Sequence, residues 1–204
     1  RRQYKEMKEL HPDCILFFRL GDFYEMFFDD AKIASKELDL VLTGRDCGQA
    51  ERAPMCGVPY HACDIYINKL IEKGYKVAIC EQMEDPKLAK GLVKREVIRI
   101  VTPGTNMSQA ILDETRNNYL MCIFGCNEEY GLAVCDITTG EFRSCHVSST
   151  AKLYDEINKY SPTEIIGNGA FLSCDLNFDY MKEKMKITIS EAPSHYFNLS
   201  LIHI

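Results

Sequence analysis

The chain has 204 residues, of which 46% are hydrophobic and 26% are charged, with 7 prolines and 12 glycines. This composition excludes a disordered chain, and the length predicts two folded domains. No run approaches the roughly 18 apolar residues of a membrane-spanning helix, and the first ten residues lack the apolar stretch of a signal peptide, so we expect a cytoplasmic location and no membrane partner.

The net charge of −6 is distributed unevenly along the chain. Residues 1–100 contain 17 Lys and Arg against 17 Asp and Glu, whereas residues 101–204 contain 7 against 13. We therefore expect any phosphate contact to come from the first half, whose cations cluster in two places. The first cluster is Arg1, Arg2, Lys5 and Lys8, and the second is Lys87, Lys90, Lys94, Arg95 and Arg99. The alternative is that both clusters are solvated surfaces with no role in binding.

The ten cysteines occur mostly singly within apolar runs, as is typical of buried free thiols. Cys47, Cys56, His61 and Cys63 lie close together in the sequence and raise the possibility of a metal site. Because no C-x-x-C pair, the usual nucleus of a structural zinc site, occurs anywhere, we expect no metal.

The first half of the chain predicts alternating helices and strands. A short helix over 1–10 stops before Pro12, and a buried strand over 14–20 ends at the turn Gly21-Asp22. Further along, the patterns predict helices over 27–38 and 64–73, strands over 40–43, 75–79 and 93–101, and a polar loop over 44–56. In the last of these strands, Val97 and Val101 are expected on one face, with Arg95 and Arg99 exposed.

The second half predicts an antiparallel meander followed by a helix and a further strand. The expected strands are 119–126, 130–138 and 141–147, the helix is 149–160 with a serine or threonine cap, and the last strand is 163–166. This order of elements is typical of a ribonuclease H-like domain.

A ribonuclease H-like domain raises the alternative of a metal-dependent nuclease. That chemistry requires several carboxylates that converge on two divalent cations about 3.5–4 Å apart. The first strand, YLMCIFGC, contains no acid, and only Asp136 on the second strand has a plausible position. We therefore interpret Asp136 as an end-of-strand residue that binds the turn at Thr138-Thr139-Gly140, and we expect no catalytic residue.

The most informative segment is FFRLGDFYEMFFDD, residues 17–30. Its aromatic residues would ordinarily be assigned to a core, but Phe23 and Tyr24 follow directly after the Gly21-Asp22 turn, with Glu25 next, and side chains at the tip of a turn are expected to point outward. An exposed Phe next to an acid suggests binding, since DNA-bending proteins insert apolar wedges between base steps and ring-on-base stacking does not depend on the base. The alternative is a protein interaction module in which the aromatic residues form the core.

At this segment the chain resembles the MutS family of mismatch-repair proteins, whose Phe-x-Glu motif matches Phe23-Tyr24-Glu25. Further stretches resemble the family's first domain and its connector domain, in the right order and spacing, from about Lys5 to about Ile166. They are GRDCGQAERAPMCGVPYHA, YKVAICEQMEDPKLAKG and REVIRIVTPGT for the first domain, and DITTGEF and SPTEII for the connector.

The resemblance implies roles for four residues. Phe23 would stack on a mispaired or unpaired base, and Glu25 would hydrogen-bond that base. The alternative interpretation of Glu25 is a solvated carboxylate in the first turn of a helix. Arg45 and Met55 match positions near the DNA in the family, with a solvated loop arginine and a core methionine as their alternatives.

The resemblance also implies the organisation of the molecule. We expect a mixed α/β mismatch-recognition domain over 1–104, a linker over 105–116, and a C-terminally truncated ribonuclease H-like connector domain over 117–204. No G-x-x-x-x-G-K-[S/T] phosphate loop occurs, so we expect no cofactor and no enzymatic activity in this chain. The full-length protein would be an ATP- and Mg²⁺-dependent homodimer that binds mismatched double-stranded DNA and a MutL-type repair protein.

Overall fold

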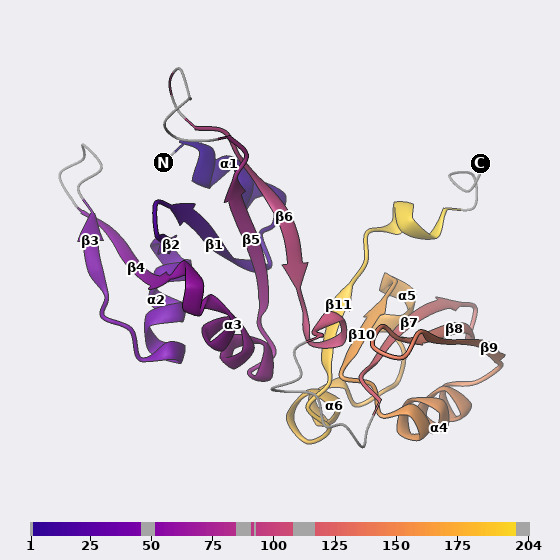
Figure 1. The fold of residues 1–204 in the computed structure, drawn as a ribbon. Helices are drawn as coiled ribbons and strands as arrows, with labels where there is room; N and C mark the ends of the chain where they lie inside the picture. The colour runs from indigo at the N-terminus through magenta and orange to yellow at the C-terminus, as the bar shows by residue number, and fades with distance from the viewer. Residues whose placement is uncertain (1, 46–51, 85–90, 92, 108–116, 199–204) are drawn as a thin grey trace. The chain divides into compact units, whose positions relative to one another are not determined.

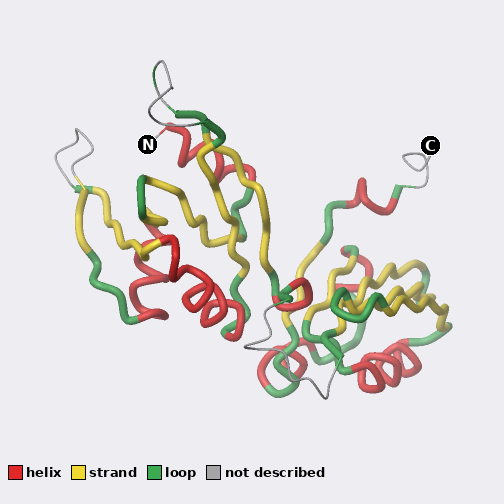
Figure 2. The backbone as a smooth tube through the Cα atoms, in the orientation of Figure 1, coloured by secondary structure: helices red, strands yellow, loops and turns green. Residues whose placement is uncertain are grey.

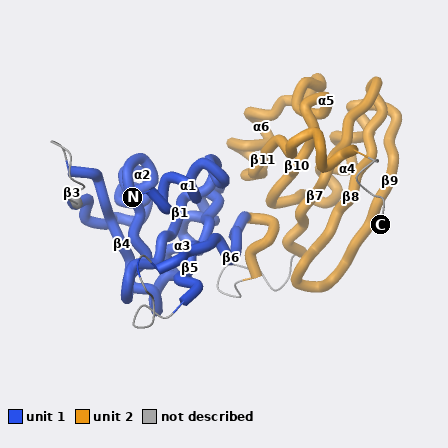
Figure 3. Tube along the Cα trace, turned by 90° about the horizontal axis from the view of Figure 1, so that it is seen from above, with its two compact units in different colours: residues 1–102 blue, residues 103–204 orange. Residues whose placement is uncertain are grey.

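The computed structural model describes the chain except for residues 1, 46–51, 85–90, 92, 108–116 and 199–204. It divides into two compact units, Arg1–Thr102 and Pro103–Ile204 (Figure 3). Most of the linker expected over 105–116 lies outside the described residues. Pro103–Thr105 forms a short 3-10 helix, η2, and the Gly104 amide donates to the Glu164 carboxylate at 3.0 Å, which ties this segment to the second unit.

The first unit is built on a six-stranded mixed sheet in the order β3-β4-β2-β1-β5-β6 (Figures 1 and 2). The central strand β1 is antiparallel to β2 and parallel to β5. The strands are β1 (Cys14–Leu20), β2 (Phe23–Phe27), β3 (Thr43–Arg45), β4 (Ala53–Pro59), β5 (Lys76–Gln82) and β6 (Arg95–Val101), and the helices are α1 (Arg2–Leu10), α2 (Phe28–Leu38), η1 (Tyr60–Ala62) and α3 (Cys63–Glu72).

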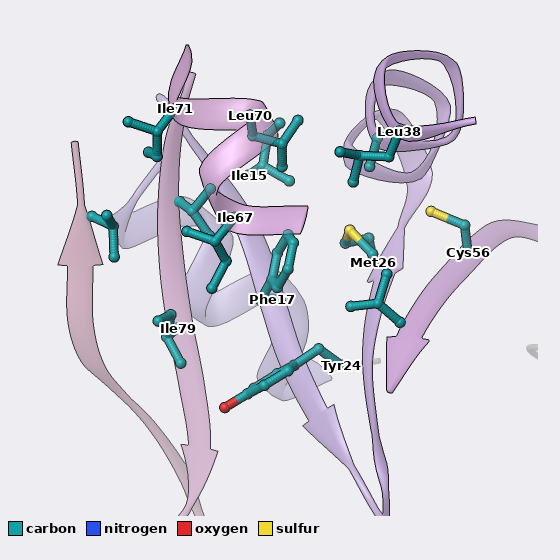
Figure 4. Close-up of a cluster of buried hydrophobic side chains, with 14 of the residues drawn as sticks. Ile15, Phe17, Tyr24, Met26, Leu38, Cys56, Ile67, Leu70, Ile71 and Ile79 are labelled. Carbon is teal, nitrogen blue, oxygen red and sulfur yellow. The ribbon is translucent and has the colours of Figure 1, made fainter. Parts of the chain in front are cut away.

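The two faces of this sheet pack against different helices. On one face, alternate side chains of β1, β2 and β5 meet α2 and α3 in the main hydrophobic core, where Phe17 and Tyr24 lie side by side (Figure 4). On the other face, Leu16, Phe18 and Phe27 pack against Tyr4 and Met7 of α1. The main core and this smaller cluster together fix which side chains of β2 point to each face.

Three expectations about the strands of the first unit are wrong. The strand expected over 40–43 is displaced, because residues 40–42 lie outside any strand and β3 begins at Thr43. Residues 44–56 are not simply a loop, because β3 and β4 pair antiparallel with Gly44 opposite Pro54. Val97 and Val101 do not share a face: a β-bulge pairs Cys80 with Val97 and Ile79 with Arg99, so one extra residue turns Val97 toward the α1 face and Val101 toward the main core.

The second unit contains a five-stranded sheet in the order β11-β10-β7-β8-β9. As expected, the first three strands form an antiparallel meander, and β10 then joins β7 in parallel. The elements are β7 (Tyr119–Cys126), β8 (Glu129–Asp136), β9 (Glu141–Val147), α4 (Thr150–Tyr160), β10 (Glu164–Gly167), α5 (Gly169–Leu172), α6 (Phe178–Glu183), β11 (Thr188–Glu191) and η3 (Ser194–Phe197).

One face of this sheet holds the hydrophobic core of the second unit. Met121, Ile123 and Leu132 point into it and pack with Leu153 and Ile157 of α4. The expected serine cap of α4 is confirmed, because the Ser149 hydroxyl accepts from the Lys152 amide at 3.3 Å. The expected fold class, mixed α/β with this order of strands and helix, is confirmed.

The exposure of the cysteines and the length of the helices can be compared with the expectations from the sequence. Not all cysteines are buried as expected, because Cys126 and Cys145 are exposed. None of the helices in the described part of the chain is long and apolar enough to cross a membrane.

Candidate nucleic-acid interface

Phe23 and Glu25 lie on the same face of strand β2. Side chains alternate along a strand, so Tyr24 and Met26 between and after them point into the main core, where both are buried. Phe23 is 46% exposed and Glu25 is half-buried. Burial of Tyr24 thus sets the strand register in which Phe23 and Glu25 face outward, since a slip of one residue would exchange the two faces.

The strands on either side of β2 present different neighbours to this pair. On the β1 side, Leu20 lies opposite Phe23 and Phe18 lies opposite Glu25. On the β4 side, the opposite residues are Pro59 and Gly57. A Cβ atom built at Gly57 would lie 3.2 Å from the Tyr24 carbonyl oxygen and 3.5 Å from Cγ of Glu25, so a larger residue at this position would crowd the Glu25 side chain.

Glu25 is not in the first turn of a helix, as one interpretation of the sequence had it. The helix α2 begins at Phe28, and Glu25 is the middle residue of β2, hydrogen-bonded into strands on both sides. The sequence signal was ambiguous because FYEMF does not alternate in hydropathy. Phe27 is buried on the same face as Glu25, where it packs against α1.

The other two candidate residues lie on the neighbouring hairpin. Arg45 ends β3, with its backbone opposite Ala53, and its side chain is outside what the structure describes. Met55 on β4 pairs with Phe27 and is therefore on the same face as Phe23 and Glu25. It is half-buried and packs against the α1-side cluster, so it is neither a fully buried core residue nor a freely exposed one.

The basic residues that the sequence analysis singled out include several that other protein groups engage. Arg95, expected to be exposed, is half-buried: its Nε donates to the carbonyl of Arg19 at 2.8 Å and its guanidinium lies 5.2 Å from the Phe18 ring centre. Burial lowers the pKa of Arg95. Lys94 pairs with Glu96, whereas Arg99 is exposed; Arg1, Lys87 and Lys90 lie outside the described residues.

A polar cluster that the sequence analysis missed lies behind Phe23, on the opposite face of the sheet. We define the Arg19 cluster as Arg19 on β1, Tyr24 on β2, Tyr60 in η1 and Glu81 on β5. The Arg19 guanidinium lies 3.7 Å from the Tyr60 ring centre and 3.6 Å from the Glu81 carboxylate, to which the Tyr24 hydroxyl also donates. The available signal was Arg19 itself, a lone charge within the apolar strand CILFFRL.

The alternatives that involve metal ions gain no support. Within the ranges that the structure describes, no three His, Cys, Asp or Glu side chains gather closely enough to hold a metal ion; Cys47 is outside these ranges. Asp136 is buried at the end of β8, where its carboxylate accepts from the amide and hydroxyl of Thr138 at 2.8 and 2.6 Å. This is the structural role expected for it.

Comparisons with known proteins match both units. The family model of MutS domain I matches residues 1–110, and that of MutS domain II matches residues 118–196. Relatives named "DNA mismatch repair protein MutS" include those of Lachnoclostridium phytofermentans, 59% identical over 97% of this chain, Acetivibrio thermocellus, 59% over 96%, and Caldanaerobacter subterraneus subsp. tengcongensis, 57% over 88%.

The chain spans about a fifth of the length of these relatives, namely 21%, 23% and 21%. Both matched domains occur in the order in which the two units follow each other in this chain. The chain therefore belongs to the MutS family and carries its domains I and II.

Proposed function

We propose that the first unit recognises mismatched double-stranded DNA, with Phe23 as a wedge and Glu25 as the group that tests the base. The observation that carries this proposal is the exposed Phe23 next to the half-buried Glu25 on one face of β2, in a chain whose relatives are named DNA mismatch repair proteins. A Phe23 ring buried in the core would instead have favoured a protein interaction module.

The Phe23 ring gains free energy by leaving water and stacking on a base. Opening a base step and kinking the duplex costs a few kcal/mol, and less where pairing is already weak. Stacking contributes about 1–3 kcal/mol whichever base is met. Discrimination therefore depends on how easily the duplex deforms at the site and not on a code of base contacts.

Glu25 adds a penalty at correctly paired sites. A carboxylate that approaches phosphates and paired bases is repelled and loses water without a new partner. A base edge freed by mispairing offers a hydrogen bond, or a shared proton, that offsets this loss. Because Glu25 is half-buried and lies on the same face of β2 as Phe23, we expect its carboxylate to meet a base that has been brought to Phe23.

We further propose roles for a longer protein that contains this chain, by analogy with the longer relatives: an ATP- and Mg²⁺-dependent homodimer in the cytoplasm that engages a MutL-type partner. Neither matched domain contains the glycine-rich loop and lysine that hold nucleotide phosphates, because no G-x-x-x-x-G-K-[S/T] motif occurs in the sequence.

The test compares a duplex carrying one unpaired thymine with the fully paired duplex. Binding is measured with the 204-residue chain, and with the same residues replacing the matching segment of the L. phytofermentans relative. Phe23→Ala should reduce the mismatch preference about 5- to 150-fold, which corresponds to the loss of about 1–3 kcal/mol of stacking. Glu25→Gln should raise the affinity for the fully paired duplex, and it should therefore also reduce the preference for the mismatched duplex over the paired one.

Phe142→Ala serves as the matched control, because Phe142 is an exposed phenylalanine on β9 of the second unit. This variant should keep the mismatch preference. If Phe23→Ala also kept it while the unsubstituted protein discriminated, the wedge would be rejected and the interaction module would become the better interpretation.

A further inference from the structure

We propose that the Arg19 cluster positions the Phe23 wedge, and that mismatch discrimination depends on Arg19, Tyr24, Tyr60 and Glu81 although they lie on the opposite face of the sheet. This inference rests on the proposed function of Phe23. It assigns these four residues a role in positioning, Tyr60 through its backbone amide as well as its ring, with no contact to DNA.

The four residues form a continuous polar row across one end of the sheet. Arg19 lies opposite Tyr24 in the β1–β2 pairing, and Arg19, Tyr24 and Glu81 extend the face that carries Phe17 and Ile79 in the main core. Figure 4 shows the Tyr24 ring reaching past Phe17, with its hydroxyl directed toward β5. The row thus closes the main core at the end of the sheet where β1 turns into β2.

The cluster binds both carbonyls of the turn that precedes Phe23. The Nε of Arg19 donates to the Gly21 carbonyl, and the amide of Tyr60 donates to the Asp22 carbonyl at 3.0 Å. Gly21 has a φ of +60°, a conformation in which a glycine is not strained. Because the two turn residues are held through their backbones, the direction in which Phe23 leaves the turn is fixed by Arg19 and Tyr60.

Glu81 holds the cluster together electrostatically. Its carboxylate accepts from the Tyr24 hydroxyl and lies 3.6 Å from Nη1 of Arg19, and the Arg19 and Glu81 side chains are only 16% and 26% exposed. Burial, with the hydrogen bond to Glu81, raises the pKa of Tyr24, so the phenol remains a donor. Without Glu81, a largely buried guanidinium would lose its counter-charge and be drawn toward solvent, away from the Gly21 carbonyl.

The position of the Phe23 ring must be more accurate than that of a side chain that only touches the surface of a partner. A wedge must meet a single base step, and functional groups need to be held within about 0.5 Å of their working geometry by the residues that support them. Loosening the turn should therefore reduce stacking at a mismatch. Affinity for a paired duplex, into which the ring does not insert, should remain unchanged.

The experiment is a double-mutant cycle between Glu81→Gln and Phe23→Ala in the same two proteins and with the same two duplexes. Glu81→Gln keeps an acceptor for Tyr24 but removes the charge that holds Arg19. We expect it to lower the mismatch preference roughly tenfold, within the range of coupling between residues that act together. In the Phe23→Ala background it should cause no further loss, because its effect passes through the ring.

Glu37→Gln is the matched control, since Glu37 pairs with Lys73 at 2.8 Å between the ends of α2 and α3 instead of at the turn. A 4-fluorophenylalanine at position 23 provides a second readout, because its ¹⁹F signal should shift with Glu81→Gln and stay in place with Glu37→Gln. A purely structural role of Glu81 would lower thermal stability without a specific change at this ring.

The outcomes separate the inference from the proposed function. If Phe23→Ala leaves the mismatch preference intact, the proposed function fails. If Phe23→Ala removes the preference but Glu81→Gln leaves it unchanged, or the two effects simply add, only the positioning role is rejected. Should Glu81→Gln fail to fold, Tyr24→Phe decides in its place, because it removes only the hydroxyl that joins Tyr24 to Glu81 and is expected to reduce the preference in the same direction.

Discussion

The Tyr4 hydroxyl is the centre of a buried hydrogen-bond network at the end of β2. It donates to the Asp30 carboxylate at 2.7 Å and accepts from the Phe27 amide at 3.2 Å, while Lys8 donates to Asp30 at 2.8 Å. The next residue, Phe28, has a φ of +55°, which is strained for an aromatic residue. Tyr4 therefore joins α1 to the point at which β2, the strand that carries Phe23 and Glu25, ends and helix α2 begins.

Tyr4→Phe should destabilise the first unit by about 1–3 kcal/mol, because the Phe27 amide and the Asp30 carboxylate each lose a buried partner while the ring packing is kept. Urea unfolding followed by hydrogen exchange in the first unit measures this loss. The control is Tyr66→Phe: Tyr66 on α3 is half-buried, and its hydroxyl makes no hydrogen bond to another described residue, so stability should stay within about 0.5 kcal/mol. Equal effects of the two substitutions would refute the role of the Tyr4 hydroxyl.

At the scale of elements, β10 and α5 meet without a layer of side chains between them. A Cβ atom built at Gly167 would lie 2.2 Å from Cδ1 of Phe171, and Phe171 is fully buried against α6 and the sheet. The Asn168 side chain caps α5 and also accepts from the Gly125 amide at 2.8 Å, which holds the helix in place. The Phe171 ring therefore cannot move away easily.

Gly167→Ala should destabilise the second unit by about 1–3 kcal/mol through overpacking. Gly131→Ala is the control, because Gly131 lies in strand β8 of the same sheet and an added Cβ there would meet nothing within 4 Å. That substitution should be neutral or slightly stabilising, since alanine restricts the unfolded chain. Thermal unfolding of both variants tests the contrast, and a similar melting temperature for the two would contradict it.

Elements with local signals could be predicted from the sequence, and elements defined by distant partners could not. The helix at Phe28–Leu38 follows from the order of its acidic and basic residues, and the meander over β7–β9 follows from its strand-like runs and the turns between them. Strand β4 contains Pro54, Gly57 and Pro59, which favour a loop, and it is a strand because it pairs with β2 about thirty residues earlier. The same non-local pairing determines the strand position of Glu25.

The candidate site shows the same limit. The place after the Gly21-Asp22 turn predicted that both Phe23 and Tyr24 point outward; Phe23 is exposed, but Tyr24 is buried in the main core because side chains alternate along β2. The half-buried state of Arg95 depends on the bulge in β6 and on the packing of α1 near that strand, where Arg95 donates to the Gln3 side chain at 3.2 Å. Neither the bulge nor this hydrogen bond can be recognised from the residues next to Arg95 in the sequence. The Arg19 cluster likewise joins four elements and is recognisable only in the folded chain.

At the scale of the whole molecule, the two units have separate cores. The two clusters of the first unit contain only residues of Arg1–Thr102, and the cluster of the second contains only residues of Pro103–Ile204. Cores that share no side chain can lose stability independently. A substitution in one unit should therefore leave the unfolding of the other unchanged, and a substitution that alters the acid response of the second unit tests this independence.

Asp136 gives the second unit a defined response to acid. Burial alone would raise its pKa, but hydrogen bonds from the side chain and amide of Thr138 and from the amide of Asn118 outweigh this effect and lower it. Because the folded pKa is below the unfolded value of about 3.9, the unfolded chain binds more protons between the two values. The stabilisation by Asp136 is thus complete above about pH 4 and is lost as the pH falls through its folded pKa.

Asp136→Asn should lower the stability of the second unit at neutral pH by about 1–3 kcal/mol, because its amide cannot accept at both oxygen positions. It should also make that unit less sensitive to acid between about pH 4 and the folded pKa of Asp136. Hydrogen exchange resolved by residue, measured from pH 7 to pH 3, reports the two units separately.

The first unit retains its own acid response through Asp13, whose pKa is lowered by Lys76 despite burial, so its profile should match that of the unsubstituted chain. A change in the profile of the first unit would show that the cores are coupled, and an unchanged acid response in the second would remove Asp136 as its cause.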